Sequence, residues 1–262
     1  MAINLSKAGF CMYYCCGITD TGSVRDHNED AFLINKLVLS QASLESNIKA
    51  PFIVAVADGV GGEASGEIAS HLCLEQLASV KFSKPEELKK KVKNIHRNLR
   101  RYGVNHDRSV NMQTTLCALA VDDKKNAYII NVGDSRLYRF RGDTITQLST
   151  DQSLVQLLYE QGKITREEKR FHAQRNIIFP VMGNLSDDPK IDVTPIEGGI
   201  RDGDLIIICS DGLSDYLSAN EFETVLSRPV KLTKRLSQLI DTALKNGSSD
   251  NLTVVALTVC EV

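Results

Sequence analysis

Short apolar runs in this chain end abruptly at an acidic residue. Residues 52–57 precede Asp58, and residues 205–210 precede Asp211. Apolar runs of this length that stop at turn signals predict buried strands, so each strand would carry a carboxylate at its tip. Residues 252–259 directly follow Asp250 and Asn251 and are rich in β-branched side chains, which predicts another acid-tipped strand.

The middle of the chain reads as a series of hairpins. Residues 128–132 and 137–140 are apolar or alternating, and they flank a turn that contains Asp134 and Arg136. A further alternating stretch at 144–148 follows a second turn. Runs of this kind joined by short turns predict antiparallel strands.

Helical periodicity is clearest after residue 83. Apolar side chains recur there at spacings of four and three, at Leu88, Val92, Ile95, Leu99 and Tyr102. Ser83 and Glu86 have the spacing of a capping box, Pro85 suits the first turn, and Gly103 predicts the end of the helix. Further helices are expected at 66–79, 153–161, 218–227 and 230–245.

The order of these elements favours one fold class. The strands do not alternate with helices as a βαβ series would, so a doubly wound parallel sheet is not expected. We expect an α+β fold, a four-layer α/β/β/α sandwich of two antiparallel sheets flanked by helices. The acidic clusters span the chain, so residues 1–262 are read as one domain, with a polar, weakly patterned surface insert at about 161–189.

Composition excludes several functional classes. Hydrophobic residues make up 42% and charged residues 24%, which suits a folded soluble protein with a large core. The formal net charge of −2 gives no reason to expect a nucleic-acid partner. The chain has neither an apolar run of roughly 18 residues nor a secretion signal, so we expect a cytoplasmic protein without a membrane partner.

The seven cysteines are expected to be reduced. Cys73, Cys117, Cys209 and Cys260 lie in apolar, periodic segments. The cluster of Cys11, Cys15 and Cys16 suggests a metal site, but no second Cys or His pair at ligand spacing accompanies it.

Four acidic clusters stand where strands end or turns begin: 28–30, 58–62, 210–212 and 249–251. If they converge, their carboxylates would repel one another unless cations neutralise them. Ligands that are all oxygen select Mg²⁺, Mn²⁺ or Ca²⁺. Two such ions about 3.5–4 Å apart can share a water, lower its pKa and present hydroxide to a phosphorus atom. Glycine after Asp58 would let the Gly59 carbonyl approach the second ion.

Each of these features also has a plainer interpretation. An Asp-Gly pair is most often a turn, and Arg25 beside Glu29 is compatible with a surface ion pair as well as with a phosphate site. Residues 58–62 lack the lysine and glycine spacing of a nucleotide-binding loop. The basic residues at 89–93 and 97–101 form either a solvated helix face or a recognition surface. Four histidines are expected to be structural or solvent-facing: His71, His96, His106 and His172.

Taken together, these segments resemble the metal-dependent serine/threonine protein phosphatases of type 2C, in their compact bacterial form. The matching blocks are GITDTG at 17–22, VRDHNED at 24–30, VADGVGG at 56–62, TT at 114–115, NVGDSRLY at 131–138, SDGL at 210–213 and SDNLT at 249–253. The resemblance spans nearly the whole chain and implies a β-sandwich with flanking helices.

The resemblance also implies a site with two Mn²⁺ or Mg²⁺ ions. Asp58 would bridge both ions, Asp211 and Asp250 would complete the first site, and the Gly59 carbonyl would serve the second. The remaining roles fall to Glu29 and Asp30 for metal-bound waters, Arg25 for the substrate phosphate, and Asp134, Arg136 and Asn251 for support. His27 neighbours this cluster and would lie behind the ligands.

Three departures from the family pattern bear on details of the mechanism. Residues 111–113 lack a glycine and an aspartate common in bacterial members, which puts a third metal site in doubt. Gln152 replaces a usual histidine, and residues 179–183 differ from the typical end of the family's flap, so substrate gating is expected to differ. Val60 stands where some members have a histidine general acid, so leaving-group protonation is unassigned.

The leading hypothesis is a phosphatase that acts on phosphorylated proteins, opposes a bacterial serine/threonine kinase and works as a monomer. A catalytically inactive phosphoprotein-binding module is the second hypothesis, and the presence of Asp58, Asp211 and Asp250 together argues against it. The third is a phosphatase for a small phosphorylated metabolite.

Overall fold

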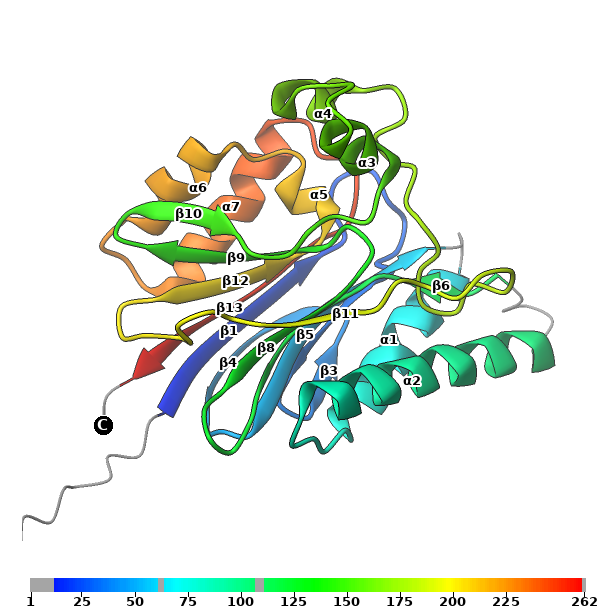
Figure 1. Cartoon of the computed structure of the whole chain (residues 1–262). Coiled ribbons are helices and arrows are strands. Elements are labelled where there is room, and N and C mark those ends of the chain that lie inside the picture. The colour runs from blue at the N-terminus through cyan, green and yellow to red at the C-terminus, as the bar shows by residue number, and fades with distance from the viewer. Residues whose placement is uncertain (1–11, 61–63, 107–110, 261–262) are drawn as a thin grey trace, which may run out of the picture.

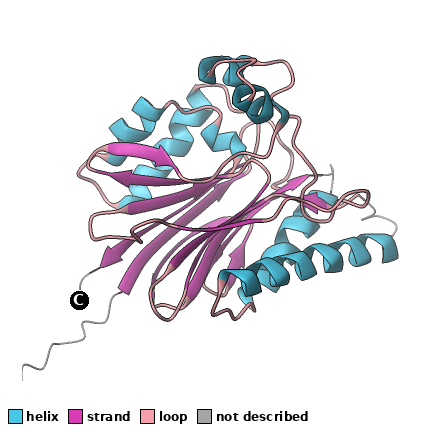
Figure 2. Ribbon diagram, in the orientation of Figure 1, coloured by secondary structure: helices cyan, strands magenta, loops and turns pink. Residues whose placement is uncertain are grey.

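The computed structural model describes residues 12–60, 64–106 and 111–260. Within these residues the strands form two antiparallel sheets that pack face to face, and helices cover both outer faces (Figures 1 and 2). The fold class expected from the sequence, a four-layer α+β sandwich, is confirmed. No helix in the described part of the chain combines the length and apolar character needed to cross a bilayer.

The first sheet has six strands in the order β10-β9-β12-β13-β1-β4. Their bounds are β1 Met12–Asp20, β4 Ala42–Ile48, β9 Arg136–Arg141, β10 Thr144–Gln147, β12 Leu205–Cys209 and β13 Leu252–Cys260. Strand β13 lies between β12 and β1, so strands from near the two ends of the chain are neighbours at the centre of the sheet.

The second sheet contains β11-β8-β7-β5-β2-β3 in that order, and β6 pairs with β5 outside this path. The bounds are β2 Asp30–Ile34, β3 Leu37–Leu39, β5 Phe52–Val60, β6 Gln113–Thr114, β7 Leu116–Val121, β8 Ala127–Val132 and β11 Asp192–Pro195. Strand β5 is buried over most of its length, as its apolar run predicted.

The helices divide between the outer faces. Helices α1 Ala64–Ala78 and α2 Pro85–Asn105 cover the second sheet, while α5 Asp211–Ser214, α6 Ala219–Leu226 and α7 Leu232–Lys245 cover the first. Helices α3 Leu154–Glu160 and α4 Arg166–Phe171 stand over α5 (Figure 1). Between the sheets lies a core to which both contribute, including Phe32, Val54, Ile206 and Val255.

Helix α2 confirms the predicted apolar face, because Leu88, Val92, Ile95 and Leu99 are buried. Pro85 lies in the first turn, as predicted, but the predicted capping box and the predicted end at Gly103 were wrong. Lys84 is the N-cap and makes no side-chain cap; the backbone N–H and hydroxyl of Ser83 instead donate to Glu87. The helix also continues through Gly103 to Asn105, and the backbone N–H of His106 then donates to the Gly103 carbonyl.

The expected surface insert contains a helix that its weak apolar pattern did not reveal. Helix α4 is held by a capping box in which Thr165 accepts from the Glu168 backbone N–H and Glu168 accepts from the Thr165 N–H. None of its residues is buried. We call residues 161–189 the flap.

Of the three cysteines considered as a metal cluster, the two in the described residues, Cys15 and Cys16, point to opposite faces of the sheet. Cys15 packs in the core between the sheets, whereas Cys16 packs in the core beneath α5–α7, because neighbouring strand residues point to opposite faces. Cys11 lies outside the described residues. Cys73, Cys117 and Cys209 are buried free thiols, and Cys260 is half-buried.

Candidate metal centre

Strand pairing brings the acidic clusters to one end of the sandwich. In the second sheet Asp30, the first residue of β2, is the register partner of Asp58 in β5. In the first sheet Asp211 follows the end of β12, and Asp250 stands just before β13. Because β12 and β13 are antiparallel neighbours, the last residues of one lie beside the first of the other.

Hydrogen bonds between the sheets fix the clusters against each other. The Ser210 hydroxyl donates to Asp30 Oδ2 at 2.7 Å and accepts from the Thr253 backbone N–H at 3.0 Å. Asn251 Oδ1 accepts from the Glu29 backbone N–H at 2.9 Å, and its amide donates to carbonyls of residues 21 and 27. Asn251 therefore holds the loop that carries Glu29.

Two glycines allow these segments to approach closely. A Cβ built on Gly59 would lie 2.3 Å from the Gly66 carbonyl oxygen and 2.7 Å from that of Glu29. A Cβ on Gly212 would lie 2.0 Å from the carbonyl oxygen of Asn251. Only glycine fits at either position, so the backbones beside Asp58 and Asp211 can approach their neighbours as closely as they do.

Two threonines hold the backbone of Asp58. The Asp58 carbonyl accepts from the Thr115 N–H and from the Thr114 hydroxyl, both at 2.9 Å, while the Asp58 N–H donates to the Thr115 hydroxyl at 3.0 Å. These bonds place the TT block noted in the sequence directly behind the acid.

The acidic side chains perturb one another strongly. Burial, together with the nearby Asp211 and Asp250 carboxylates, raises the pKa of Asp30 to about 7, against the opposing effect of the Ser210 hydrogen bond. Burial and the Asp215 and Asp250 charges raise the pKa of Asp211 to about 6. The pKa of Asp58 is also raised well above its usual range, by burial and by Asp30 and Asp211.

Two further acids belong to this cluster. The pKa of Asp134 is raised well above its usual range by burial and by the charge of Asp211. Burial also raises the pKa of Glu29, whose Oε1 atom lies 3.5 Å from His27 Nε2 and accepts no hydrogen bond within the described residues. Burial and mutual repulsion therefore favour protonated carboxyl groups here, and full ionisation would need cations to balance the charge.

Arg25 lies at the edge of the acid cluster. Its Nη2 donates to Asp250 Oδ2 at 2.9 Å, and about half of its side chain is exposed. The hydrogen bond to Asp250 raises the pKa of Arg25 despite partial burial. An exposed, permanently charged guanidinium beside clustered acids is suited to receive phosphate oxygens.

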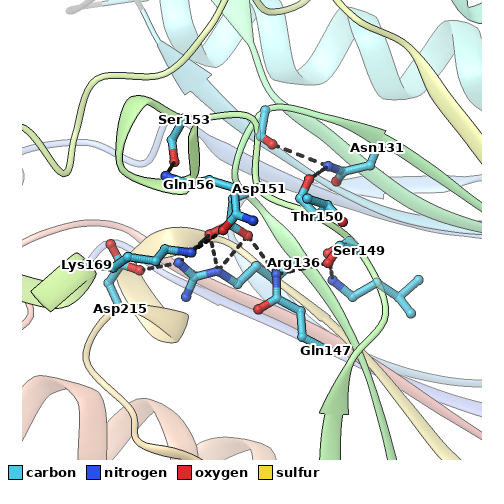
Figure 3. Close-up of polar contacts among 12 residues, drawn as sticks. Asn131, Arg136, Gln147, Ser149, Thr150, Asp151, Ser153, Gln156, Lys169 and Asp215 are labelled. Carbon is cyan, nitrogen blue, oxygen red and sulfur yellow. Dashed lines mark hydrogen bonds and ion pairs between the residues drawn. The ribbon is translucent and has the colours of Figure 1, made fainter. Parts of the chain in front are cut away.

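Arg136, two residues after Asp134, forms a partly buried network of polar contacts (Figure 3). It binds Asp151 through Nε at 3.0 and 3.1 Å and through Nη2 at 2.8 Å, and Nη2 also lies 2.8 Å from Asp215 Oδ1. Lys169 from the flap reaches Asp151 at 3.7 Å. Asp215 follows α5, so this network joins the flap to the helix that begins with Asp211.

The residues fit hard divalent cations. In the described ranges, no three Asp, Glu, His or Cys side chains already enclose an ion position, and the Asp250 side chain is held by Arg25. A closed cage is not required, since Mg²⁺ and similar ions keep several waters and bind through few carboxylates. On losing their protons to solvent, the buried acids would provide the negative charge that such ions need, and these acids with the unsatisfied Glu29 oxygen would provide oxygen donors.

The structure brings most of the predicted residues together, but not all can be placed. Gly61 and Gly62 lie outside the described residues. His71, His106 and His172 occupy partly or fully exposed positions, and buried His96 accepts from the Gly183 N–H at 3.0 Å. The sequence did not predict that Ser210 bonds to Asp30 or that Asp215 pairs with Arg136. Only the four-residue spacing from Asp211 to Asp215 hinted at the second contact.

Comparison with known proteins finds that this chain is similar to protein phosphatases. A family model described as protein phosphatase 2C matches residues 26–254. The serine/threonine phosphatase stp of Listeria welshimeri is 31% identical over 246 residues, 90% of this chain and 92% of that protein. The S. agalactiae serine/threonine phosphatase structure has a TM-score of 0.80 at 28% identity and covers 94% of this chain and 99% of its own.

A second solved structure bears on the metals. The catalytic domain of the serine/threonine protein phosphatase PstP, in complex with two manganese ions, has a TM-score of 0.77 at 28% identity. It covers 96% of this chain and 100% of its own.

Proposed function

The chain belongs to the protein phosphatase 2C family, and from this premise we propose which of its residues carry the hydrolysis of phosphoserine and phosphothreonine. The protein is a metal-dependent serine/threonine protein phosphatase with a centre for two Mn²⁺ or Mg²⁺ ions. Its substrates are phosphorylated proteins, and within the proposal it opposes a serine/threonine kinase in the bacterial cytoplasm.

Asp58, Asp211 and Asp250 would hold the first ion, and Asp58 with the Gly59 carbonyl would hold the second. Glu29 and Asp30 would accept hydrogen bonds from waters around the ions. When bound, the cations supply Lewis acidity, which lowers the pKa of water and neutralises the charge of the phosphate group. The convergence of these acids from both sheets, with raised pKa values, is the observation that carries the proposal.

The chain's own groups then position the substrate. Arg25 would receive two phosphate oxygens, since its fork is exposed and lies beside the acids. Asp250 orients that fork through its 2.9 Å hydrogen bond. Asp134, Arg136 and Asn251 would support the ligands, because Asn251 fixes the Glu29 loop and Arg136 fixes Asp215 behind α5.

The test is release of phosphate from a phosphothreonine peptide with Mn²⁺, with Mg²⁺ and with excess chelator. We expect metal-dependent release. Asp211→Asn should reduce turnover and Mn²⁺ affinity by more than the roughly 10–100-fold that loss of an outer-shell partner costs, because an amide lacks the charge of a ligand.

Asp241→Asn is the matched control, since Asp241 is exposed on α7. Wild-type turnover in Asp211→Asn would contradict the assignment of this residue. A folded protein that releases no phosphate with either metal would instead support the binding module. Strong competition by small phosphorylated metabolites against the peptide would support the third hypothesis.

A further inference from the structure

His96 on α2 is a buried, titratable side chain that none of the roles proposed above uses. Its side chain is 0% exposed. The Nδ1 atom accepts from the Gly183 backbone N–H at 3.0 Å, so the ring is neutral and carries its proton on Nε2. This hydrogen bond joins α2 to the last part of the flap.

The other ring nitrogen faces an acid of the flap. His96 Nε2 lies 3.5 Å from Asp188 Oδ1 and, within the described residues, has no hydrogen-bond partner. From α2, Lys93 and Arg100 also approach the Asp188 carboxylate, at 3.0 and 3.4 Å. These two cations already outnumber the single carboxylate. A second proton on His96 would therefore place a third positive charge here, on a ring that solvent does not reach.

The segment that His96 holds is packed against β6. Met182 exchanges two backbone hydrogen bonds with Thr114 of β6, both at 3.0 Å. Gly183 has a φ of +85°, and a Cβ there would lie 2.4 Å from the Met112 carbonyl oxygen. The end of the flap is thus in close contact with the chain around β6, and the hydrogen bond to His96 ties it to α2 as well.

This contact continues to the backbone of a proposed metal ligand. The Thr114 hydroxyl donates to the Asp58 carbonyl at 2.9 Å, and the backbone N–H of Thr115 donates to the same carbonyl at 2.9 Å. Thr114 is therefore bonded both to the end of the flap and to Asp58. If Met182 moved away from β6, Thr114 would lose its backbone partner, and Asp58 would lose part of its support.

Protonation of His96 would break the first link in this series. A doubly protonated ring has no acceptor, so Nδ1 could no longer take the Gly183 N–H. Burial lowers the pKa of His96 against the opposing charge of Asp188, and Arg100 and Lys93 act in the same direction as burial. The neutral ring stabilises the closed contact, and this stabilisation is lost as the pH falls below about 6.5, where the opened chain takes up the proton.

We propose that His96 is a positioning residue for the metal centre: by holding the end of the flap on β6 it supports the backbone of Asp58, and its protonation releases that hold. The inference rests on the proposed role of Asp58 as the bridging ligand. Mn²⁺ affinity and turnover should therefore fall in acid more steeply than protonation of the ligands alone would cause.

Two substitutions separate the hydrogen bond from its titration. His96→Asn keeps an acceptor, because an amide oxygen can take the Gly183 N–H, but an amide does not titrate in this range. His96→Leu keeps an apolar side chain in the buried position and has no acceptor. His71→Asn, at a partly exposed position on α1, is the matched control for the change of residue type.

The first measurement is hydrogen exchange of the peptide that contains Gly183, in excess chelator at pH 8 and pH 5.5, as protection relative to the intrinsic rate. A histidine that takes its proton at about pH 6.5 in the open state favours opening about tenfold at pH 5.5. Protection in the wild type relative to His96→Asn should therefore fall about tenfold between these pH values, and His71→Asn should behave as the wild type. An unchanged ratio would overturn the titration of His96.

The second measurement, at pH 8, tests the positioning role. His96→Leu should weaken Mn²⁺ binding in calorimetry and lower kcat for a phosphothreonine peptide, each about tenfold with little change in KM, as expected on loss of an outer partner of a metal ligand. His96→Asn should restore most of both. Wild-type Mn²⁺ affinity in folded His96→Leu would overturn this role. Because the exchange experiment needs neither metal nor substrate, an inactive wild-type protein would contradict the proposed function and leave the exchange result standing.

Discussion

Arg25 is bound to the carboxylate of Asp250, although half of its side chain faces solvent. Replacement by alanine should raise KM for a phosphothreonine peptide by about tenfold or more, because each hydrogen bond between charged groups contributes roughly 1.5–3 kcal/mol. Mn²⁺ affinity, measured by calorimetry, should change much less. The KM of Arg25→Lys should lie between those of the wild type and Arg25→Ala, since lysine keeps the charge but loses the planar fork. An unchanged KM in Arg25→Ala would remove this residue from the phosphate site.

Asp30 makes the stability of the metal-free protein depend on pH. Its pKa is about 7 in the folded protein, against about 4 in the unfolded chain, so the folded state binds the extra proton between these values. In chelator, the contribution of Asp30 to stability is therefore fully present at about pH 4 and below, and it is lost as the pH rises to about 7. Asp211, with a pKa of about 6, contributes with the same sign.

The measurement is thermal unfolding in excess chelator between pH 5 and 8, for the wild type and for Asp30→Asn. We expect the variant to lose less stability over this range, since asparagine can still accept from Ser210 but has no proton to release. Saturating Mn²⁺ should raise the melting temperature more at pH 8 than at pH 5, because ligands must be deprotonated to bind. Parallel curves for the two proteins would contradict the Asp30 assignment.

At the scale of elements, the contact between α5 and the loop before β13 depends on Gly212. An alanine Cβ there would lie 2.0 Å from the Asn251 carbonyl oxygen and 3.1 Å from the Asp250 Cβ. Gly212→Ala should therefore separate Asp211 from Asp250, reduce Mn²⁺-dependent turnover about 100-fold and destabilise the protein by about 1–3 kcal/mol. Turnover and urea unfolding are measured on the same preparation.

Gly142→Ala is the control for this substitution. Its Cβ would meet nothing within 4 Å, but its φ of +54° is unfavourable for alanine by about 1–2 kcal/mol. We expect a similar loss of stability with full turnover. Equal turnover in the two variants would show that the close approach at Gly212 has no influence on the acids.

The elements that the sequence predicted well are those whose pattern is local. The face of α2 and the strands β5, β12 and β13 follow from side-chain periodicity and turn signals alone, although β5 continues through Asp58 to Val60 instead of ending before the acid. The ends of α2 do not, because Ser83 bonds to Glu87 rather than to Glu86, and a glycine at position 103 does not by itself stop a helix. Helix α4 was missed because it buries nothing and so has no apolar stripe.

In the acid cluster, too, only the features set by short segments could be predicted from the sequence. Individual carboxylates could be predicted from strand tips and from the family resemblance, since both are properties of short segments. The contacts of Ser210 with Asp30, of Arg136 with Asp215 and of Lys169 with Asp151 join residues far apart in the chain. They depend on sheet order and on the docking of the flap, which no short pattern in a single sequence specifies.

At the scale of the whole molecule, the core between the sheets is shared. Phe32 and Val54 from one sheet pack with Ile206 and Val255 from the other, so neither sheet can keep its inner face covered alone. We infer one cooperative domain and expect a single unfolding transition. Tyrosine fluorescence, which is usable because the chain has no tryptophan, should coincide with circular dichroism in urea. Two separated transitions would contradict a single domain.

Strand β13 completes both the first sheet and the acid cluster, because it lies between β12 and β1 and is preceded by Asp250 and Asn251. A nascent chain on the ribosome holds Arg25, Glu29, Asp30 and Asp58 long before these residues are made. Until then the central gap of the sheet is open and the Glu29 loop lacks its Asn251 contact. Phosphatase activity therefore begins only after the ribosome has passed β13, and a product terminated before this strand is inactive.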